Sequence, residues 1–292
     1  MFEQITQWAK NSETIKEAQI GDGGYPFWKE AVKFILLMIL TEFIITFIVV
    51  MPIVQINLDA NATVLIQLFS TVIFIGIYLL FILKVEKRNL RSVGFSKDNI
   101  LSSYVKGLLI GFVMISIIIM AGLLLGEYKF ESFNLNDLYL FIPFLLGYMI
   151  QSMKEEIFAR GWIMISIARR NNISLAIIFS SLSFVVIHIF NNDVGLLALI
   201  NIFIMGVFLS LLFLRYDNIW ICGAFHAAWN FTLSYLYGLN VSGLKTASFL
   251  LVSQVHKSII GGNAFGPEAG LIATITTLIA IAVILYKKPA DG

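Results

Sequence analysis

The stretch of sequence that decides the fold spans residues 138–168 and reads LYLFIPFLLGYMIQSMKEEIFARGWIMISIA. It is mostly apolar and longer than the roughly 20 residues that a helix needs to cross a bilayer. Near its middle lie four charged residues: Lys154, Glu155, Glu156 and Arg160. A charge at the centre of a membrane helix costs about 2.5–3.5 kcal/mol on insertion scales. The stretch therefore indicates either a membrane helix whose charges have a role inside it or a cytoplasmic helix end with solvated charges.

The composition of the whole chain favours the membrane. Of its 292 residues, 59% are hydrophobic and 13% are charged, and the mean hydropathy is +0.87. A soluble domain carries roughly 25% charged residues, so the composition excludes a soluble enzyme, a disordered chain and a disulfide scaffold. The single cysteine, Cys222, leaves no partner for an intrachain disulfide. A net charge of +2 gives no reason to expect a nucleic-acid partner.

Long apolar runs predict the fold class. The runs lie near 31–54, 63–84, 104–125, 138–168, 173–190, 194–214, 218–238 and 269–286. They are continuous and lack the alternation of barrel strands, so strands are not expected in them. The prediction is an all-α, polytopic membrane protein with about eight transmembrane helices.

Lys and Arg in the short loops predict the orientation, because such residues favour the cytoplasmic side. If the amino terminus is inside, that side receives Lys84, Lys87, Arg88, Arg91, Lys97, Lys106, Arg169, Arg170, Arg215, Lys287 and Lys288. The outside receives only Lys129, Lys245 and Lys257. We therefore predict that both termini are cytoplasmic.

The chain is expected to form one membrane domain after a polar segment. Residues 1–30 are rich in charges and are predicted to lie at the membrane surface or in the cytoplasm. Residues 31–288 form the predicted membrane-embedded domain, with a motif core at 138–240. Glu42, midway along the first run, is expected to pair with a polar group on another helix.

The two adjacent carboxylates in the first motif have different surroundings. Glu156 and Arg160 are four residues apart and share a helix face, so they are predicted to pair. Glu155 is rotated by about 100° and is predicted to have no local partner, which leaves it available for chemistry. Gln151, one turn earlier, is expected to hydrogen-bond near the site.

Two histidines lie in other apolar runs. His188 follows Phe184 by four residues, and His226 precedes Asn230 by four. Each alone is compatible with a buried hydrogen bond between helices. Counted from the inner turns at about 1.5 Å per residue, however, Glu155 and His188 reach roughly 22–25 Å, Asn230 roughly 20 Å and His226 roughly 14 Å. The four groups are therefore predicted to meet in one layer.

A carboxylate and two imidazoles in a dry cavity suit the activation of water. Glu155 would take a proton from water with help from His188, and His226 and Asn230 would donate to the developing oxyanion. A metal alternative uses Glu155, His188 and His226 as zinc ligands. The sequence lacks His-Glu-x-x-His and Gly-x-Ser-x-Gly, which makes the usual helical zinc site and a serine nucleophile less attractive.

The three motifs, Glu-Glu-x-x-x-Arg, Phe-x-x-x-His and His-x-x-x-Asn, resemble those of the CPBP family in this order and spacing. These are the CAAX-prenyl-protease and bacteriocin-processing intramembrane endopeptidases, also called the Abi family. The resemblance implies an active site of Glu155, His188, His226 and Asn230, supported by Glu156 and Arg160. It also implies a glutamate-type protease without a metal cofactor, with zinc as the alternative.

The resemblance implies an integral membrane protein, and it suggests a bacterial plasma membrane. The expected partners are the bilayer and a membrane-bound or lipidated protein or peptide substrate, with no nucleic acid. A rival hypothesis is a non-catalytic scaffold of the same fold in bacteriocin immunity or regulation. A third is a proton-coupled transporter that uses Glu155 and the histidines as a relay. Neither the oligomeric state nor the cleaved bond follows from the sequence.

Overall fold

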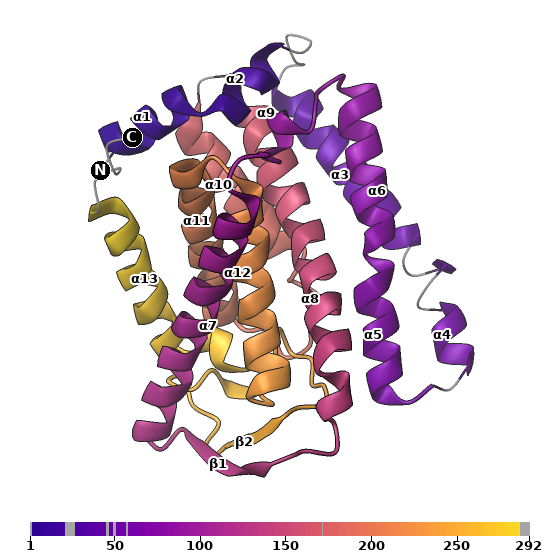
Figure 1. Cartoon of the computed structure of the whole chain (residues 1–292), viewed down its shortest axis with the longest axis vertical. Helices are drawn as coiled ribbons and strands as arrows, with labels where there is room; N and C mark the ends of the chain where they lie inside the picture. The colour runs from indigo at the N-terminus through magenta and orange to yellow at the C-terminus, as the bar shows by residue number, and fades with distance from the viewer. Residues whose placement is uncertain are drawn as a thin grey trace.

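The computed structural model describes residues 2–20, 27–44, 47–48, 51–56, 58–170 and 172–286. Within these ranges the chain forms a bundle of helices (Figure 1). Each predicted apolar run contains helix. The elements are α3 (Phe27–Ile44), α4 (Met51–Ile56), α5 (Ala60–Ser70), α6 (Val72–Leu80), the π-helix η2 (Phe81–Val85), α7 (Ile100–Leu124), α8 (Phe141–Glu156), the π-helix η5 (Ile157–Met164), α9 (Ile165–Ala168), α10 (Ile173–Val186), α11 (Leu196–Tyr216), α12 (Ile219–Phe231), the π-helix η6 (Thr232–Leu236) and α13 (Leu271–Tyr286).

The described helices support an integral membrane protein. Three helical stretches are long and apolar enough to cross a bilayer: Ala60–Val85, Ile100–Leu124 and Leu196–Tyr216. Shorter apolar helices cover Val32–Thr41, Ile173–Val186 and Leu271–Tyr286. The count of about eight crossings stays a prediction.

Within the described residues, the first predicted run contains α3, which is described up to Ile44, and α4, which is described from Met51. Pro52 lies at the second position of α4, where its missing N–H is tolerated. The side chain of Glu42 lies outside the described residues.

Short strands close one end of the bundle. β1 (Tyr128–Phe133) pairs antiparallel with β2 (Leu250–Gln254) below the helices in Figure 1. These strands lie between the apolar runs, so the all-α prediction omitted them. Each has at most six residues, too few for a clear periodic signal against the neighbouring loops.

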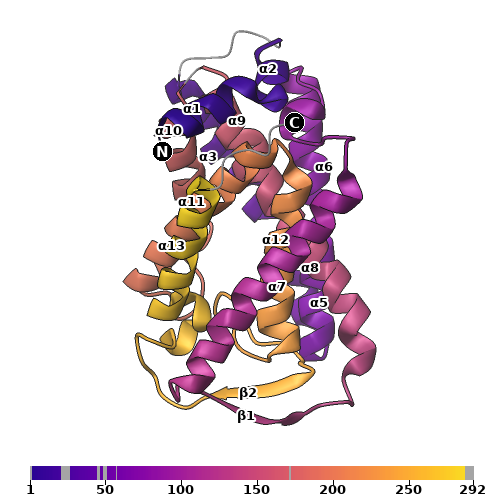
Figure 2. The same ribbon diagram turned by 60° about the vertical axis from the view of Figure 1, so that its left-hand side comes forward.

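Two amphipathic helices lie across the opposite end. α1 (Phe2–Asn11) and α2 (Glu13–Ile20) cover the ends of the longer helices there (Figure 2). Asp217 holds these two helices in place. It accepts a hydrogen bond from Ser12 Oγ at 2.5 Å and forms an ion pair with Arg91. This contact joins the polar amino-terminal segment to the loop between α11 and α12.

Two glycines set the position of α12, which carries two of the predicted site residues. A Cβ atom on Gly107 of α7 would lie 2.3 Å from the carbonyl oxygen of Ile221, and one on Gly111 would lie 2.4 Å from that of Phe225. Both distances are shorter than real Cβ contacts, so only glycine permits this approach. Small residues four apart commonly allow such close helix packing in membranes.

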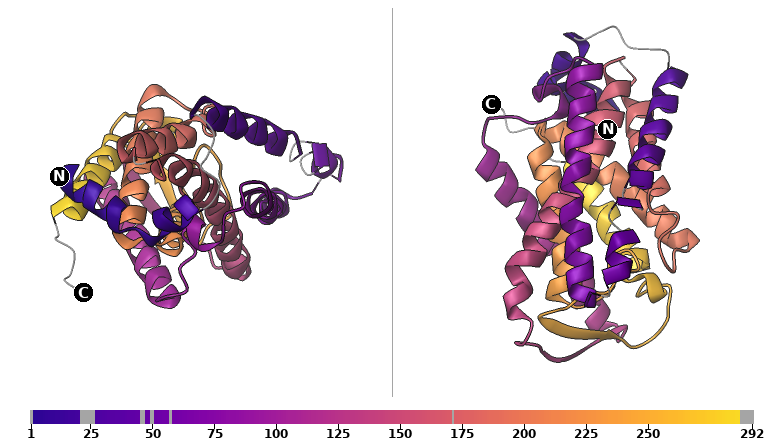
Figure 3. Two further views of the ribbon diagram at one scale, coloured as in Figure 1. Left: turned by 90° about the horizontal axis from the view of Figure 1, so that it is seen from above. Right: turned by 90° about the vertical axis from the view of Figure 1, so that its right-hand side faces the viewer.

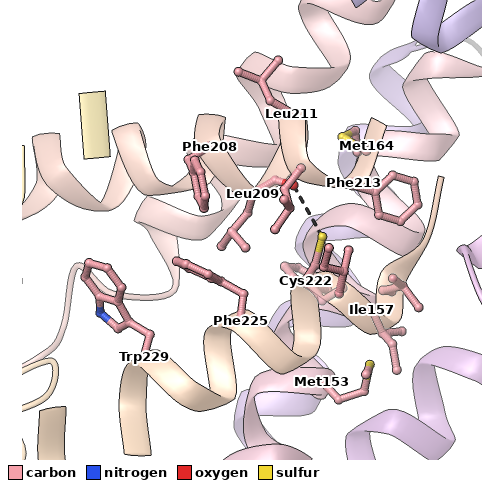
Figure 4. Close-up of a cluster of buried hydrophobic side chains, with 14 of the residues drawn as sticks. Met153, Ile157, Met164, Phe208, Leu209, Leu211, Phe213, Cys222, Phe225 and Trp229 are labelled. Atoms are coloured by element: carbon pink, nitrogen blue, oxygen red, sulfur yellow. Dashed lines mark hydrogen bonds between the residues drawn. The ribbon is translucent and has the colours of Figure 1, made fainter. Parts of the chain in front are cut away.

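Around Cys222, the interior between α8, α11 and α12 is apolar and closely packed. Cys222 is fully buried there, and its Sγ approaches the carbonyl oxygen of Leu209 at 3.6 Å (Figure 4). Figure 4 also shows Met153 and Ile157 near Cys222. The thiol therefore serves packing, as expected for a small buried hydrophobe.

The amino-terminal helices of the bundle form a wall on one side. From above, α3, α4 and α5 lie apart from the group that contains α11, α12 and α13 (Figure 3). α5 and α6 both contact α8. Gln67 of α5 and Glu155 of α8 line one cavity.

Candidate active site

The predicted site residues come from three separate helical regions. Glu155 and Glu156 end α8, and His226 and Asn230 lie one turn apart on α12. His188 lies two residues beyond the end of α10. The structure brings these residues together in the interior, and each is less than one-tenth exposed.

The predicted pair between Glu156 and Arg160 is present. Arg160 Nη1 donates to Glu156 Oε1 at 3.1 Å, and both side chains are fully buried. The guanidinium also donates to the Gly206 carbonyl at 3.2 Å and lies over the Phe184 ring at 4.6 Å. Arg160 therefore ties α8 to α10 and α11.

Glu156 also holds His226. The distance from His226 Nδ1 to Glu156 Oε1 is 2.9 Å. Because a carboxylate only accepts hydrogen bonds, Nδ1 carries the proton and donates it. The Nε2 edge of the ring then faces Glu155 Oε2 at 3.8 Å.

Glu155 has local partners, contrary to the prediction. Gln151 Nε2 donates to Glu155 Oε1 at 2.6 Å, and Lys154 Nζ lies 3.6 Å from the same oxygen. The expectation that Gln151 would hydrogen-bond near the site is confirmed, whereas Lys154 was not considered as a partner of Glu155. The other oxygen, Oε2, is buried and has no hydrogen-bond partner among the described residues.

The apolar run 173–190 predicted that His188 lies within a helix, and this prediction is wrong. α10 ends at Val186, and the His188 ring turns back so that Nδ1 lies 2.7 Å from the Phe184 carbonyl oxygen. This oxygen belongs to the last turn of α10, where carbonyls lack helical donors. Since Nδ1 must donate, Nε2 of the neutral ring remains an acceptor.

A cavity of about 390 Å³ joins these groups. Glu155, His188, Asn230 and Gln151 lie on its wall. α5 supplies Val64, Gln67 and Leu68 to the lining of this cavity. The cavity therefore extends from the candidate site to α5.

A smaller cavity of about 40 Å³ shares His188 and Asn230 with the larger one and is also lined by His226. Glu268 lines it too. Its Oε1 accepts from Trp229 Nε1 at 2.7 Å, and its Oε2 accepts from the backbone N–H of Ser242 at 2.7 Å.

Ser242 lies on the walls of both cavities and has a left-handed φ of 50°. The sequence predicted no part in the site for Ser242 or Glu268. Neither belongs to a motif, and the contact between them joins loops 26 residues apart.

The donor set does not fit a zinc ion well. Among the described residues, no three His, Cys, Asp or Glu side chains are arranged so that they could hold a metal. The predicted ligands Glu155, His188 and His226 share the region, and the bond from His226 Nδ1 to Glu156 leaves Nε2 as the nitrogen of that ring that could bind a metal.

Residues 137–232 match the model of the family described as Rce1-like, type II CAAX prenyl endopeptidase Rce1-like. The resemblance seen in the motifs is confirmed. The match includes every predicted site residue from Glu155 to Asn230, whereas Ser242 and Glu268 lie beyond it. A comparison with curated proteins gives no match.

The Rce1-like match supports CAAX-type intramembrane protease activity and thus a hydrolase in a bilayer. It does not favour the scaffold hypothesis, and it gives no support to a role in bacteriocin immunity. The mechanism, the substrate and the roles of the individual residues are proposals.

Proposed function

We propose that this protein is an intramembrane endopeptidase that hydrolyses a peptide bond of a membrane-bound or lipidated substrate. One observation carries the proposal. Glu155 Oε2 is buried without a hydrogen-bond partner among the described residues, and Glu155 shares a cavity with His188 and Asn230. An unsatisfied carboxylate oxygen is costly unless a water or a substrate group satisfies it.

Glu155 is the general base in this proposal. A water in the cavity donates one hydrogen bond to Glu155 Oε2 and the other to His188 Nε2. Glu155 takes the proton as the water oxygen attacks the scissile carbonyl carbon. Positioned proton transfer of this kind contributes about 10²- to 10⁴-fold to a rate.

Asn230 and His226 stabilise the oxyanion that forms. Asn230 donates through Nδ2, and His226 donates through Nε2 in its imidazolium form. The carbonyl π electrons move onto the oxygen, and they return as the C–N bond breaks. The proton held by Glu155 then passes to the leaving nitrogen, so the carboxylate is regenerated.

Glu156 and Arg160 support the site through His226. Glu156 Oε1 holds the ring at Nδ1, and Arg160 holds Glu156. This arrangement directs Nε2 toward Glu155 Oε2. A fixed orientation matters because oxyanion donors act only within about 2.7–3.1 Å of the charge that develops.

We also propose the setting of this reaction. The chain would cross the bilayer about eight times, with both termini in the cytoplasm and a single domain over residues 31–288. The membrane would be a bacterial plasma membrane. The bilayer and the substrate are the proposed partners, and no cofactor is required.

The test is proteolysis in liposomes against a panel of membrane-anchored and lipidated peptides. Wild type runs beside Glu155→Gln and His188→Ala, with and without a chelator, and product masses identify the cleaved bond. We expect Glu155→Gln and His188→Ala to lose cleavage, and the chelator to have no effect.

Each other outcome changes a different part of the proposal. Loss of wild-type cleavage in chelator, with recovery in zinc, would move the mechanism to the metal alternative. Full activity of both variants in cells would end the protease hypothesis in favour of a scaffold. Flux that depends on a proton gradient would favour transport.

A further inference from the structure

Gln151 touches two of the proposed catalytic residues at once. Its Nε2 donates to Glu155 Oε1 at 2.6 Å, and its Oε1 accepts from Asn230 Nδ2 at 3.1 Å. It therefore bridges α8 and α12 on the wall of the larger cavity. No other hydrogen-bonded connection between Glu155 and Asn230 is found in the described part of the chain.

The chemistry of the carboxylate fixes the direction of this bridge. Ionised Glu155 only accepts hydrogen bonds, so the Gln151 amide must turn its NH₂ group toward it. The Gln151 oxygen then faces Asn230, which must present its own NH₂ group in turn. Ser152 Oγ donates to the same Gln151 oxygen at 3.3 Å and favours this orientation.

Gln151 occupies one hydrogen-bonding position of Glu155 and one of Asn230. A second position of each group is left for the reaction. Glu155 Oε1 is occupied, while Oε2 has no hydrogen-bond partner among the described residues. One hydrogen of the Asn230 amide goes to Gln151, so the second can point to an oxyanion. If Asn230 were turned over, its oxygen would face the developing negative charge.

We propose that Gln151 is a positioning residue that sets the amide orientation of Asn230 from the charge of Glu155. This inference rests on the proposed peptidase function and adds a residue to its site. Gln151 touches the catalytic groups, not the reacting atoms, so its effect is on the catalytic step. Substrate binding depends on the whole cavity and is affected little.

Two variants separate the two bonds. Gln151→Met keeps the length of the side chain and removes both hydrogen bonds. Gln151→Glu keeps an acceptor for Asn230 but cannot donate to Glu155 when it is ionised, and it adds a like charge beside the base. Gln7→Met is the matched control, because Gln7 is an exposed amide of α1 that lines neither cavity.

The measurements are kcat, KM and the thermal unfolding midpoint in detergent, with Glu155→Gln as the inactive reference. We expect Gln151→Met to lower kcat about 10- to 100-fold, the size of effect that misplaced catalytic groups produce. KM should stay within about twofold for Gln151→Met, and Gln7→Met should keep both kcat and KM. Gln151→Glu should lose at least as much kcat as Gln151→Met.

The outcomes separate this inference from the proposed function. If Glu155→Gln is inactive while Gln151→Met keeps wild-type kcat, the inference is overturned and the proposed function stands. If KM changes by the same factor as kcat, or if the unfolding midpoint falls clearly, Gln151 is only structural and the inference also fails. If wild type shows no cleavage that depends on Glu155, both proposals fail.

Discussion

Two buried charge clusters lie along the continuous helix formed by α8, η5 and α9, and they differ in one respect. The first is the candidate site around Glu155. The second, which we call the Glu86 cluster, contains Lys33, Glu86, Arg88, Trp162 and Ser166. Both clusters contain a carboxylate and a cation. Of the two, only the candidate site borders one of the cavities described above.

Every oxygen of Glu86 has a donor. Oε1 accepts from Lys33 Nζ at 3.2 Å and from Trp162 Nε1 at 3.0 Å, and Oε2 accepts from Arg88 Nη1 at 3.2 Å. In the candidate site, by contrast, Glu155 and Glu156 each keep one buried oxygen without a partner among the described residues. The comparison teaches that a satisfied cluster stabilises the fold, whereas an unsatisfied oxygen beside a cavity is available for chemistry.

The largest expected effect is on the stability provided by the Glu86 cluster. Arg88→Met leaves Glu86 Oε2 buried without the Arg88 guanidinium, and breaking a buried pair costs about 3–5 kcal/mol. We expect a much lower unfolding midpoint and yield in detergent. Cleavage per folded molecule should stay unchanged, and a selective loss of cleavage would contradict the division between the clusters.

The next effect is on catalysis. Asn230→Ala removes a proposed oxyanion donor, and removal of one such donor lowers kcat about 10²- to 10³-fold. We expect the unfolding midpoint to change far less than in Arg88→Met. The comparison breaks if Asn230→Ala keeps wild-type kcat in the liposome assay.

A smaller effect concerns pH. Burial alone would raise the pKa of Glu86, but Arg88, the Trp162 hydrogen bond and Lys33 outweigh it and hold the pKa below its ordinary value. The folded state then binds this proton less readily than the unfolded state, so the stability is present above the unfolded pKa of about 4.3.

That contribution is lost as the pH falls through the lowered pKa of Glu86. We expect the unfolding midpoint of wild type to fall further between pH 6 and acid conditions than that of Glu86→Gln, because the variant has no proton to gain at this position. Equal losses in the two proteins would show that Glu86 does not carry this dependence.

The smallest effect is expected at the exposed pair of Lys129 and Glu131 on β1, which are 3.1 Å apart. Exposed ion pairs are screened by water and salt, so Lys129→Met should leave the unfolding midpoint and cleavage unchanged. A clear drop in either measurement would show that the outer sheet matters more than its exposure suggests.

The sequence predicted the main features of the site from local spacing. The separation of four residues between Glu156 and Arg160 was enough to predict their pair, and the apolar runs identified the helices. The depth argument predicted that Glu155, His188, His226 and Asn230 would meet. Three of them share one cavity, and His226 Nε2 lies 3.8 Å from Glu155 Oε2.

Other features depend on contacts between distant segments. The bond from His226 to Glu156 joins residues 70 apart, and that from Asn230 to Gln151 joins residues 79 apart. No periodic pattern encodes such pairings, because they follow from how α8 and α12 pack. The end of α10 before His188 was missed for a related reason, since the residues after Val186 stay apolar while the helix stops.

The most direct test of the account compares the same substitution in both clusters. Glu155→Gln and Glu86→Gln each remove one buried carboxylate charge, and cleavage per folded molecule and the unfolding midpoint are measured side by side. The account predicts that Glu155→Gln loses about 10²- to 10⁴-fold in kcat with little change in midpoint. Glu86→Gln should lower the midpoint and keep its kcat. Wild-type kcat in Glu155→Gln would contradict the claim that this carboxylate activates water.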